Sequence, residues 1–479
     1  MLFHSLVFFY FFITVYTVSC LLSTLSNRLR ASSWIFRVNK IFLLGASYYF
    51  YAHWDARFLA LIIISTLVDF LTGSWIYHTE NKKSRKIFLS LSLVVNLGIL
   101  GFFKYFNFFI ESANLALSNL NFTMDHLNVI LPIGISFYTF QSMSYSLDIY
   151  FKKLKPTRDL IDFAFYVSFF PQLVAGPIVR ASYFLPQLLR PTKFSVESFI
   201  IGLQVFLYGL FLKVVIADNV GAIIDPIFKN PEGYDILAVW VAVIGYSVQI
   251  FCDFCGYSEM AIGAAHSLGY ILPTNFRTPY LATDLFDFWR RWHISLTSWL
   301  RDYLYIPLGG NRKGLARTCI GAFITMLLGG LWHGANWTFV LWGIFHGMGL
   351  MINRIMAFFL KGRIALNPFL TLCKWAATYL FVCFGWVLFR SGNLDTAMQI
   401  YEKLLLVEPN ALNWAFLSLE NLFFLPFIII LHLWLYITKQ DRLTFKPGTF
   451  ASHLYIALMI SMIFIFAPID HKGFIYFQF

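Results

Sequence analysis

The chain has 479 residues, of which 59% are hydrophobic, 20% aromatic and 13% charged, and its formal net charge is +12. Soluble domains carry about 25% charged residues, so a chain this apolar cannot hide its surface from water by folding on itself. The composition predicts an all-α integral membrane protein and excludes a soluble enzyme. Lysines and arginines cluster in loops, which is typical of the cytoplasmic face of a membrane protein. No soluble basic domain that would indicate nucleic-acid binding is evident.

Apolar stretches long enough to cross a bilayer recur along the chain. A spanning helix needs about 20 apolar residues, and we expect about 11 to 13 spanning or re-entrant helices. No repeat or linker marks a soluble domain, so residues 1–479 are expected to form one polytopic membrane domain. The candidate stretches are 3–25, 39–54, 56–77, 86–110, 128–150, 160–180, 197–217, 237–267, 318–334, 336–358, 369–390, 421–438 and 452–469.

The ends of the first stretches indicate how the chain enters the membrane. The N-terminal segment MLFHSLVFFYFFITVYTVSCLL lacks a basic region and a small-residue cleavage site, so we expect a first span and not a cleaved signal. Lysine and arginine concentrate in loops 28–40, 81–86 and 151–158, while loop 111–127 has none. Basic loops favour the cytoplasmic side, which places the N-terminus outside.

The six cysteines give no sign of a disulfide framework or a zinc site. They lie in or beside apolar segments, and Cys252 and Cys255 form a C-x-x-C without a second pair or histidines nearby. We expect buried free thiols and no metal site.

Segment 271–317 interleaves charged and aromatic residues and contains no long apolar run. A helix over residues 284–305 would place four apolar side chains on one stripe, as in an interfacial or re-entrant segment on the cytoplasmic side. Arg290 and Arg291 on that segment are expected to meet either anionic lipid headgroups or the phosphates of an anionic donor. The stripe consists of Phe288, Trp292, Leu296 and Trp299.

Histidines in apolar surroundings are the strongest candidates for chemistry. His333 lies in LLGGLWHGANW, where glycines allow close backbone approach and leave space for a polar side chain. Desolvated imidazole is neutral and can accept a proton or an acyl group, although a structural histidine is an equal alternative. His346 lies thirteen positions further, roughly 20 Å away along an unbroken helix. His293 shares a passage with His333 only if the chain folds back; otherwise it is a locally bonded interfacial residue.

The motifs around His293 and His333, taken together with their spacing, resemble the membrane-bound O-acyltransferase (MBOAT) superfamily, and in particular its bacterial, alginate O-acetyltransferase-like branch. They are FWRRWHISLTSWLRDYLYIPLGGNRKG and LLGGLWHGANWTFVLWGIFHG. Four further stretches agree in order and spacing: LPIGISFYTFQSMSYSLDIY at 131–150, FPQLVAGPIVR at 170–180, FCDFCGYSEMAIGAA at 251–265 and FGWVLFR at 384–390.

The resemblance implies a helical, funnel-shaped enzyme of the bacterial cytoplasmic (inner) membrane, surrounded by lipids. It implies an acetyl group passed from a cytoplasmic donor to an exported polysaccharide such as alginate, with acetyl-CoA as co-substrate, no bound cofactor and an extracytoplasmic serine esterase-like partner. His333 matches the essential histidine of the family's W-H-G motif. His293 matches a position where many eukaryotic relatives carry asparagine, so positioning is its safer role. Arg290 and Arg291 lie where the donor would approach.

The chain ends in HKGFIYFQF, and this aromatic tail, residues 470–479, is expected to dock into the membrane domain. Phe474, Tyr476 and Phe479 form F-x-Y-x-x-F, which resembles the C-terminal motif of the small partner peptide in D-alanylation machinery. That resemblance makes Tyr476 a candidate acyl carrier. An aromatic plug without chemistry is the alternative.

Three other functions stay open. Within the family these are O-acetylation of peptidoglycan and D-alanylation of teichoic acid. Outside it, a transporter without catalysis also has many spans and buried polar residues.

Overall fold

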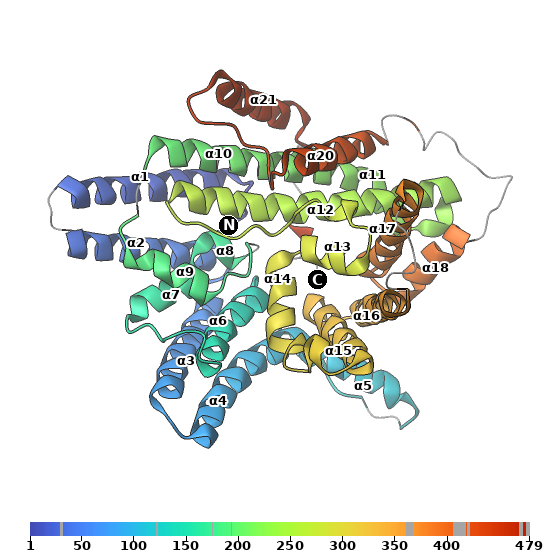
Figure 1. Cartoon of the computed structure of the whole chain (residues 1–479), viewed down its shortest axis with the longest axis horizontal. Coiled ribbons are helices and arrows are strands. Elements are labelled where there is room, and N and C mark those ends of the chain that lie inside the picture. Colours follow the sequence, from blue (N-terminus) through green and yellow to red (C-terminus); the bar gives the residue numbers. More distant parts are fainter. Residues whose placement is uncertain are drawn as a thin grey trace. The chain divides into compact units, whose positions relative to one another are not determined.

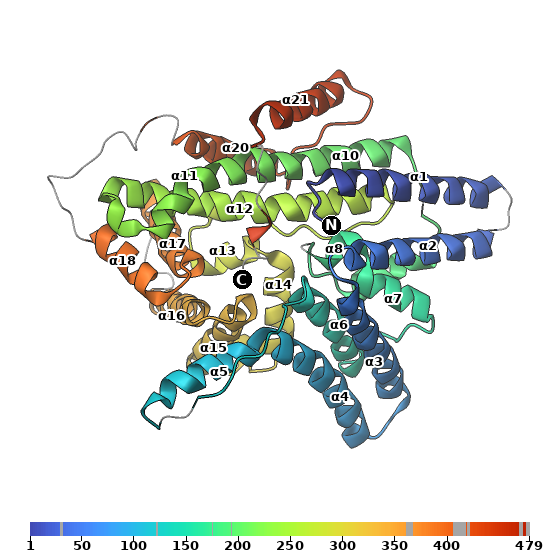
Figure 2. The same ribbon diagram turned by 180° about the vertical axis from the view of Figure 1, so that it is seen from behind.

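The computed structural model describes residues 1–28, 32–120, 123–174, 176–192, 194–360, 367–405, 418, 422–468 and 473–475. Within these ranges the regular elements are helices and no strand occurs (Figures 1 and 2). The chain divides into two compact units, and the division falls inside α10, α12 and α21. The first unit comprises Met1–Phe206, Tyr257–Pro273 and Thr444–Tyr455; the second comprises Leu207–Gly256, Thr274–Leu443 and Ile456–Phe479. The expectation of one catalytic domain over residues 1–479 stays a prediction.

The first unit is built from the N-terminal helices, in which α3, α4 and α6 pack against one another (Figures 1 and 2). Its helices are α1 (Leu6–Arg28), α2 (Ser32–Ala52), α3 (Leu59–His78), α4 (Lys82–Leu100), α5 (Phe106–Ala116), α6 (Ile135–Tyr150), α7 (Leu160–Ser168), α8 (Phe170–Leu173), α9 (Ala181–Phe184) and the first part of α10 (Val196–Leu210).

A buried carboxylate joins three of these helices. Asp69 of α3 is fully buried and accepts hydrogen bonds from donors on α4 and α6. A carboxylate with this many donors is satisfied without a cation, so the cluster fastens the three helices together. The donors are the hydroxyl groups of Ser92, Ser142 and Ser146 and the amide of Asn96.

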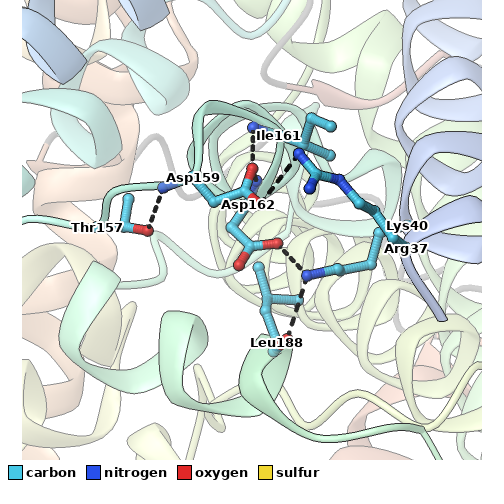
Figure 3. Close-up of polar contacts among 7 residues, drawn as sticks. All are labelled: Arg37, Lys40, Thr157, Asp159, Ile161, Asp162 and Leu188. Atoms are coloured by element: carbon cyan, nitrogen blue, oxygen red, sulfur yellow. Dashed lines mark hydrogen bonds and ion pairs between the residues drawn. The ribbon is translucent and has the colours of Figure 1, made fainter. Parts of the chain in front are cut away.

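A second polar contact in this unit joins α2 to α7 (Figure 3). The Lys40 Nζ forms a buried ion pair with Asp162, and an Arg37 nitrogen lies 3.6 Å from an Asp159 carboxylate oxygen. Asp159 also caps α7, because its Oδ1 accepts from the Ile161 N–H at 2.8 Å. The contact brings Arg37 and Lys40, at the start of α2, beside the start of α7, which directly follows basic loop 151–158. The charge pattern predicts these two parts of the chain on the same side of the membrane.

The second unit contains the segments with the candidate histidines. Its helices are the end of α10, α11 (Asp218–Lys229), α12 (Ile236–Ser267), α13 (Leu285–Arg291), α14 (Ile294–Leu300), α15 (Leu315–His333), α16 (Trp337–Phe359), α17 (Pro368–Arg390), α18 (Leu394–Leu405), α20 (Phe424–Thr438) and the end of α21 (Phe450–Phe466). In this unit, short 3₁₀ segments lie at Pro231–Gly233, Pro279–Leu281 and Gly310–Arg312, and π-helical segments at Phe211–Ala217 and Arg301–Tyr305. In the first unit, 3₁₀ segments lie at Ala56–Phe58, Ser118–Leu120 and Leu185–Leu189, and a π-helical segment at Gly101–Tyr105.

In the second unit α15 and α16 form a tight hairpin, in which the two helices lie side by side (Figures 1 and 2). A Cβ atom on Gly330 would lie 2.4 Å from the Phe339 carbonyl oxygen and 2.9 Å from the Gly343 Cα. A Cβ on Gly343 would lie 2.6 Å from the Met326 carbonyl oxygen. The two backbones therefore approach too closely for any larger residue, which is how small residues pack membrane helices.

Eight helices of the described ranges are long and apolar enough to cross a membrane, and two shorter apolar helices, α20 and α21, accompany them. Not every candidate stretch forms one long helix. Stretch 128–150 becomes helical only at Ile135, after Gly134 with φ +76°, and stretch 160–180 holds the nine-residue α7 and the four-residue α8. A nine-residue helix rises only about 14 Å, against about 30 Å of hydrocarbon.

Candidate active site

His333 is the last residue of α15, and the chain turns directly after it. Gly334 has extended backbone angles, and the Asn336 side chain accepts a hydrogen bond from the Thr338 N–H at 3.0 Å, which starts α16. The helix is therefore not continuous between His333 and His346. The His333 side chain is buried, with its ring centroid 5.1 Å from the rings of both Trp342 and Phe389.

His293 lies at a break that the predicted helix over residues 284–305 did not include. α13 ends at Arg291, and His293 takes a left-handed backbone with φ +43° before α14 begins. Such angles are uncommon for a residue other than glycine, and they mark a strained position that its surroundings must hold. Asn275 does so: its carbonyl oxygen accepts from the Ile294 N–H at 2.9 Å, and its Oδ1 accepts from the Ser295 N–H at 3.1 Å.

The four apolar side chains of the predicted stripe are buried despite the break. Phe288, Trp292, Leu296 and Trp299 are all buried. The prediction of one continuous helix over residues 284–305 is wrong, because two seven-residue helices and a π-helical turn replace it.

The structure brings His293 and His333 together, with their ring centroids 6.5 Å apart. The ring of Trp332 lies 6.0 Å from that of His293, and the ring of Phe254 lies 4.6 Å from it. Burial lowers the pKa of His293 to about 3, so its imidazole is neutral at pH 7 and offers one donor and one acceptor nitrogen. The rings of Trp332 and Phe254 beside His293, and of Trp342 and Phe389 beside His333, form an aromatic wall around the two imidazoles. A neutral imidazole within hydrogen-bonding reach of a hydroxyl can accept its proton.

His346 contacts the aromatic wall through Trp342. It is fully buried, and its ring lies 4.8 Å from Trp342, the ring that also contacts His333. Gly385 packs directly on it, since a Cβ there would lie 2.6 Å from His346 Nε2. The hairpin thus places His346 one aromatic ring away from His333, where its size helps to fix Trp342.

The two candidate arginines differ in their contacts. Arg291 donates to Asp287 Oδ2 at 2.8 Å and to the Thr278 hydroxyl at 3.2 Å, so it fastens the end of α13. Arg290 lies 3.5 Å from Asp287 Oδ1, and its side chain is 71% exposed. Arg290 is therefore the better placed of the two to meet an anion.

The candidate carrier Tyr476 lies outside the described residues. The tail residues just before it are placed: Phe474 and Ile475 are both buried, and the Phe474 ring lies 5.7 Å from that of Phe254. The Ile475 N–H donates to Asp253 Oδ2 at 2.9 Å.

Sequence reasoning missed the partner of Asp253. Lys213 lies within the apolar stretch GLFLKVVIADNV, and its Nζ is 2.8 Å from Asp253 Oδ1 and 2.6 Å from Asp218 Oδ1. An ionisable residue inside an apolar span is itself a signal of function or pairing. Asn275 gave no such signal, because an asparagine in a loop is unremarkable in sequence.

Among the described residues, no group of three or more His, Cys, Asp or Glu side chains could hold a metal ion.

The model of the MBOAT, membrane-bound O-acyltransferase family matches residues 89–391, a range that includes His293, His333 and His346. The chain belongs to the membrane-bound O-acyltransferase family. It is accordingly a multi-pass membrane O-acyltransferase, and the family that the two motifs predicted is confirmed.

Curated relatives of this MBOAT protein include enzymes with different acceptors. A probable alginate O-acetylase AlgI of Pseudomonas putida is 43% identical over 371 residues, which cover 76% of this chain and 74% of the relative. A peptidoglycan O-acetyltransferase of Helicobacter pylori is 34% identical over 493 residues, which cover 92% and 91%. A teichoic acid D-alanyltransferase of Bacillus subtilis is 28% identical over 276 residues, which cover 55% and 69%.

We predict that His293→Asn keeps acyl transfer within about tenfold of the parent, whereas His293→Leu loses far more. Asparagine tolerates the left-handed backbone and keeps a hydrogen-bonding side chain, and leucine does neither. With its pKa lowered to about 3, His293 does not titrate between pH 5 and 8, so His293→Asn should also preserve the pH profile in that range. Transfer rates of both variants measured across this range check the prediction. Equal activity of the asparagine and leucine variants would show that no polar group is needed there.

Proposed function

We propose that this enzyme transfers an acetyl group from acetyl-CoA on the cytoplasmic side of the bacterial inner membrane to an exported polysaccharide such as alginate, with His333 at its centre. The observation that carries the proposal is the approach of His293 and His333 to 6.5 Å inside an aromatic wall. The resemblance to alginate O-acetylases supports the acetyl group and the polysaccharide acceptor.

The proposed reaction is an acyl transfer from thioester to ester. The His333 imidazole accepts the proton of the attacking hydroxyl, the hydroxyl oxygen bonds to the acetyl carbonyl carbon, and the carbon–sulfur bond breaks. The proton then passes to the departing thiolate of CoA. His293 orients the reacting groups by hydrogen bonding, and the rings of Trp342 and Phe389 exclude water that would hydrolyse the thioester.

Two further residues have roles in the proposed reaction: Arg290 binds the donor, and the hydroxyl of Tyr476 accepts the acetyl group. Exposed Arg290 meets the phosphates of CoA, and Arg291 holds the end of α13 beside it. Tyr476 of the tail receives the acetyl group first. An extracytoplasmic serine esterase-like partner then takes it from Tyr476 and passes it to the polysaccharide.

Peptidoglycan is the second candidate acceptor, and one observation favours it. The alignment with the Helicobacter pylori peptidoglycan O-acetyltransferase covers 92% of this chain, whereas the alignment with the Pseudomonas putida alginate relative covers 76%. The relative with lower identity thus matches more of the chain's length.

Sealed membrane vesicles containing the enzyme and its partner, supplied with radiolabelled acetyl-CoA, test the donor and the acceptor together. We expect label to enter glycan in inside-out vesicles, whose cytoplasmic face is exposed, and not in right-side-out vesicles. Label released by alginate lyase supports the first acceptor, and label released by muramidase supports the second. Absence of label in both orientations, with the partner present, would contradict acetyl-CoA as the donor.

A further inference from the structure

A buried ion cluster lies in the second unit, apart from the paired histidines. Lys213 belongs to the π-helical segment Phe211–Ala217, and its ammonium contacts two carboxylates: Asp218 Oδ1 at 2.6 Å and Asp253 Oδ1 at 2.8 Å. All three side chains are at most 4% exposed. Gly256 permits this close contact of α12 with the π-helical segment, because a Cβ there would lie 3.1 Å from the Lys213 backbone nitrogen and 2.6 Å from the Gly209 carbonyl oxygen at the end of α10.

The charges of this cluster do not balance within it. One ammonium faces two carboxylates, and buried carboxylates are costly unless further donors satisfy their oxygens. The second oxygen of Asp253 meets such a donor in the C-terminal tail, since the Ile475 N–H lies 2.9 Å from Asp253 Oδ2. A backbone donor on an ionised acceptor makes a stronger hydrogen bond than a neutral pair.

The same turn of α12 connects this contact to the candidate active site. Phe254 follows Asp253 directly, and its ring lies 5.7 Å from that of Phe474 and 4.6 Å from that of His293. Phe474 is fully buried there. Two neighbouring residues of α12 therefore hold the tail, and one of them also contacts a candidate site histidine.

We propose that Asp253, held by Lys213, is a positioning residue that fastens the C-terminal tail beside His293. Its carboxylate binds the tail backbone through the Ile475 N–H, while Phe254 receives Phe474. The evidence for this fastening is the hydrogen bond from Ile475 to Asp253 and the ring contact of Phe474 with Phe254. Its consequence for catalysis, the placement of Tyr476 for acylation, rests on the proposed function.

The test compares Asp253→Ala with Asp218→Ala. Each variant removes one of the two carboxylates of Lys213, and Asp253 is the one that accepts the hydrogen bond from the Ile475 N–H. The full-length, detergent-solubilised proteins are digested with a carboxypeptidase, and intact mass follows the removal of Ile475 and Phe474. We expect removal to be at least about tenfold faster in Asp253→Ala and unchanged in Asp218→Ala. Equal acceleration in both variants, or in neither, would overturn the proposal.

A second pair of variants leaves the buried ions untouched, so it stays informative if Asp253→Ala does not fold. Ile475→Pro removes the N–H donor, and Ile475→Ala trims the same side chain but keeps the donor. Each rate is divided by the rate for the same variant after unfolding, which cancels the intrinsic resistance of proline to the protease. The normalised rate of tail digestion is expected to be higher for the proline variant than for the alanine variant, and matching normalised rates would refute the hydrogen bond as a fastening. Digestion needs no acyl transfer. Failure of the fastening is therefore distinguishable from failure of the proposed reaction, which wild-type labelling reports separately.

Discussion

Replacement of His333 by alanine is expected to lower acetyl transfer by about 10²- to 10⁴-fold, the range that a positioned acid–base group contributes. The His333 imidazole is buried at the end of α15, against the rings of Trp342 and Phe389 and 6.5 Å from the ring of His293. Alanine offers no proton acceptor in place of the imidazole. Labelled acetyl transfer measured at equal protein levels gives the size of the loss.

His432→Ala is the matched control, since it removes an equally buried imidazole from the same unit. The ring of His432 lies 4.9 Å from that of Phe251 and 5.7 Å from that of Tyr280, and its Nδ1 lies 3.0 Å from the Ile428 carbonyl oxygen. Both variants lose comparable packing, and a thermal denaturation measurement should show similar destabilisation. If His432→Ala loses transfer as completely as His333→Ala, the loss reports damaged packing and not chemistry at His333.

The candidate histidines could be found from sequence, but their meeting could not. His333 stands out because a polar residue among glycines and tryptophans in an apolar stretch is rare. Its approach to His293 depends on the hairpin turn after His333 and on the left-handed backbone at His293. The left-handed backbone at His293 is held by contacts distant in sequence, those of Asn275 with Ile294 and Ser295.

The helical periodicity of residues 284–305 illustrates the same limit. Apolar spacing grouped Phe288, Trp292, Leu296 and Trp299 as one stripe of an interfacial helix, and all four are buried within the protein. It could not show the break at Trp292 and His293, because no glycine or proline marks it. Periodicity reports which side chains need burial, and it does not report whether the backbone between them stays helical.

The pairing of Lys213 with Asp253 was not predicted. A lysine within an apolar stretch is itself a signal, because such a residue needs a partner. The sequence alone does not show which partner it meets, because the contact depends on the close approach of two helical segments at Gly256. The hydrogen bond from the tail to Asp253 was beyond any local pattern.

Replacement of Tyr476 by phenylalanine is expected to abolish transfer to glycan if the tail carries the acetyl group, because only the phenolic hydroxyl can form the ester. A phenol has a pKa near 10, well below that of a sugar hydroxyl, so its acetyl ester passes readily to a serine and then to the glycan. Phe474 and Ile475, which precede Tyr476, are already docked in the unit that holds His293 and His333. Transfer to glycan in partner-containing membranes is the measurement.

Comparison of Tyr476→Phe with Tyr476→Ala separates the carrier from an aromatic plug. A plug needs only the ring, so phenylalanine should then support full transfer and alanine should not. A carrier needs the hydroxyl, so both variants should fail, while the carboxypeptidase digestion of the tail stays slow in Tyr476→Phe. Omission of the partner from the parent protein should in addition trap label on the C-terminal peptide, in a form that hydroxylamine releases. Full transfer by Tyr476→Phe would remove the carrier role and return the acceptor hydroxyl to the partner or the glycan itself.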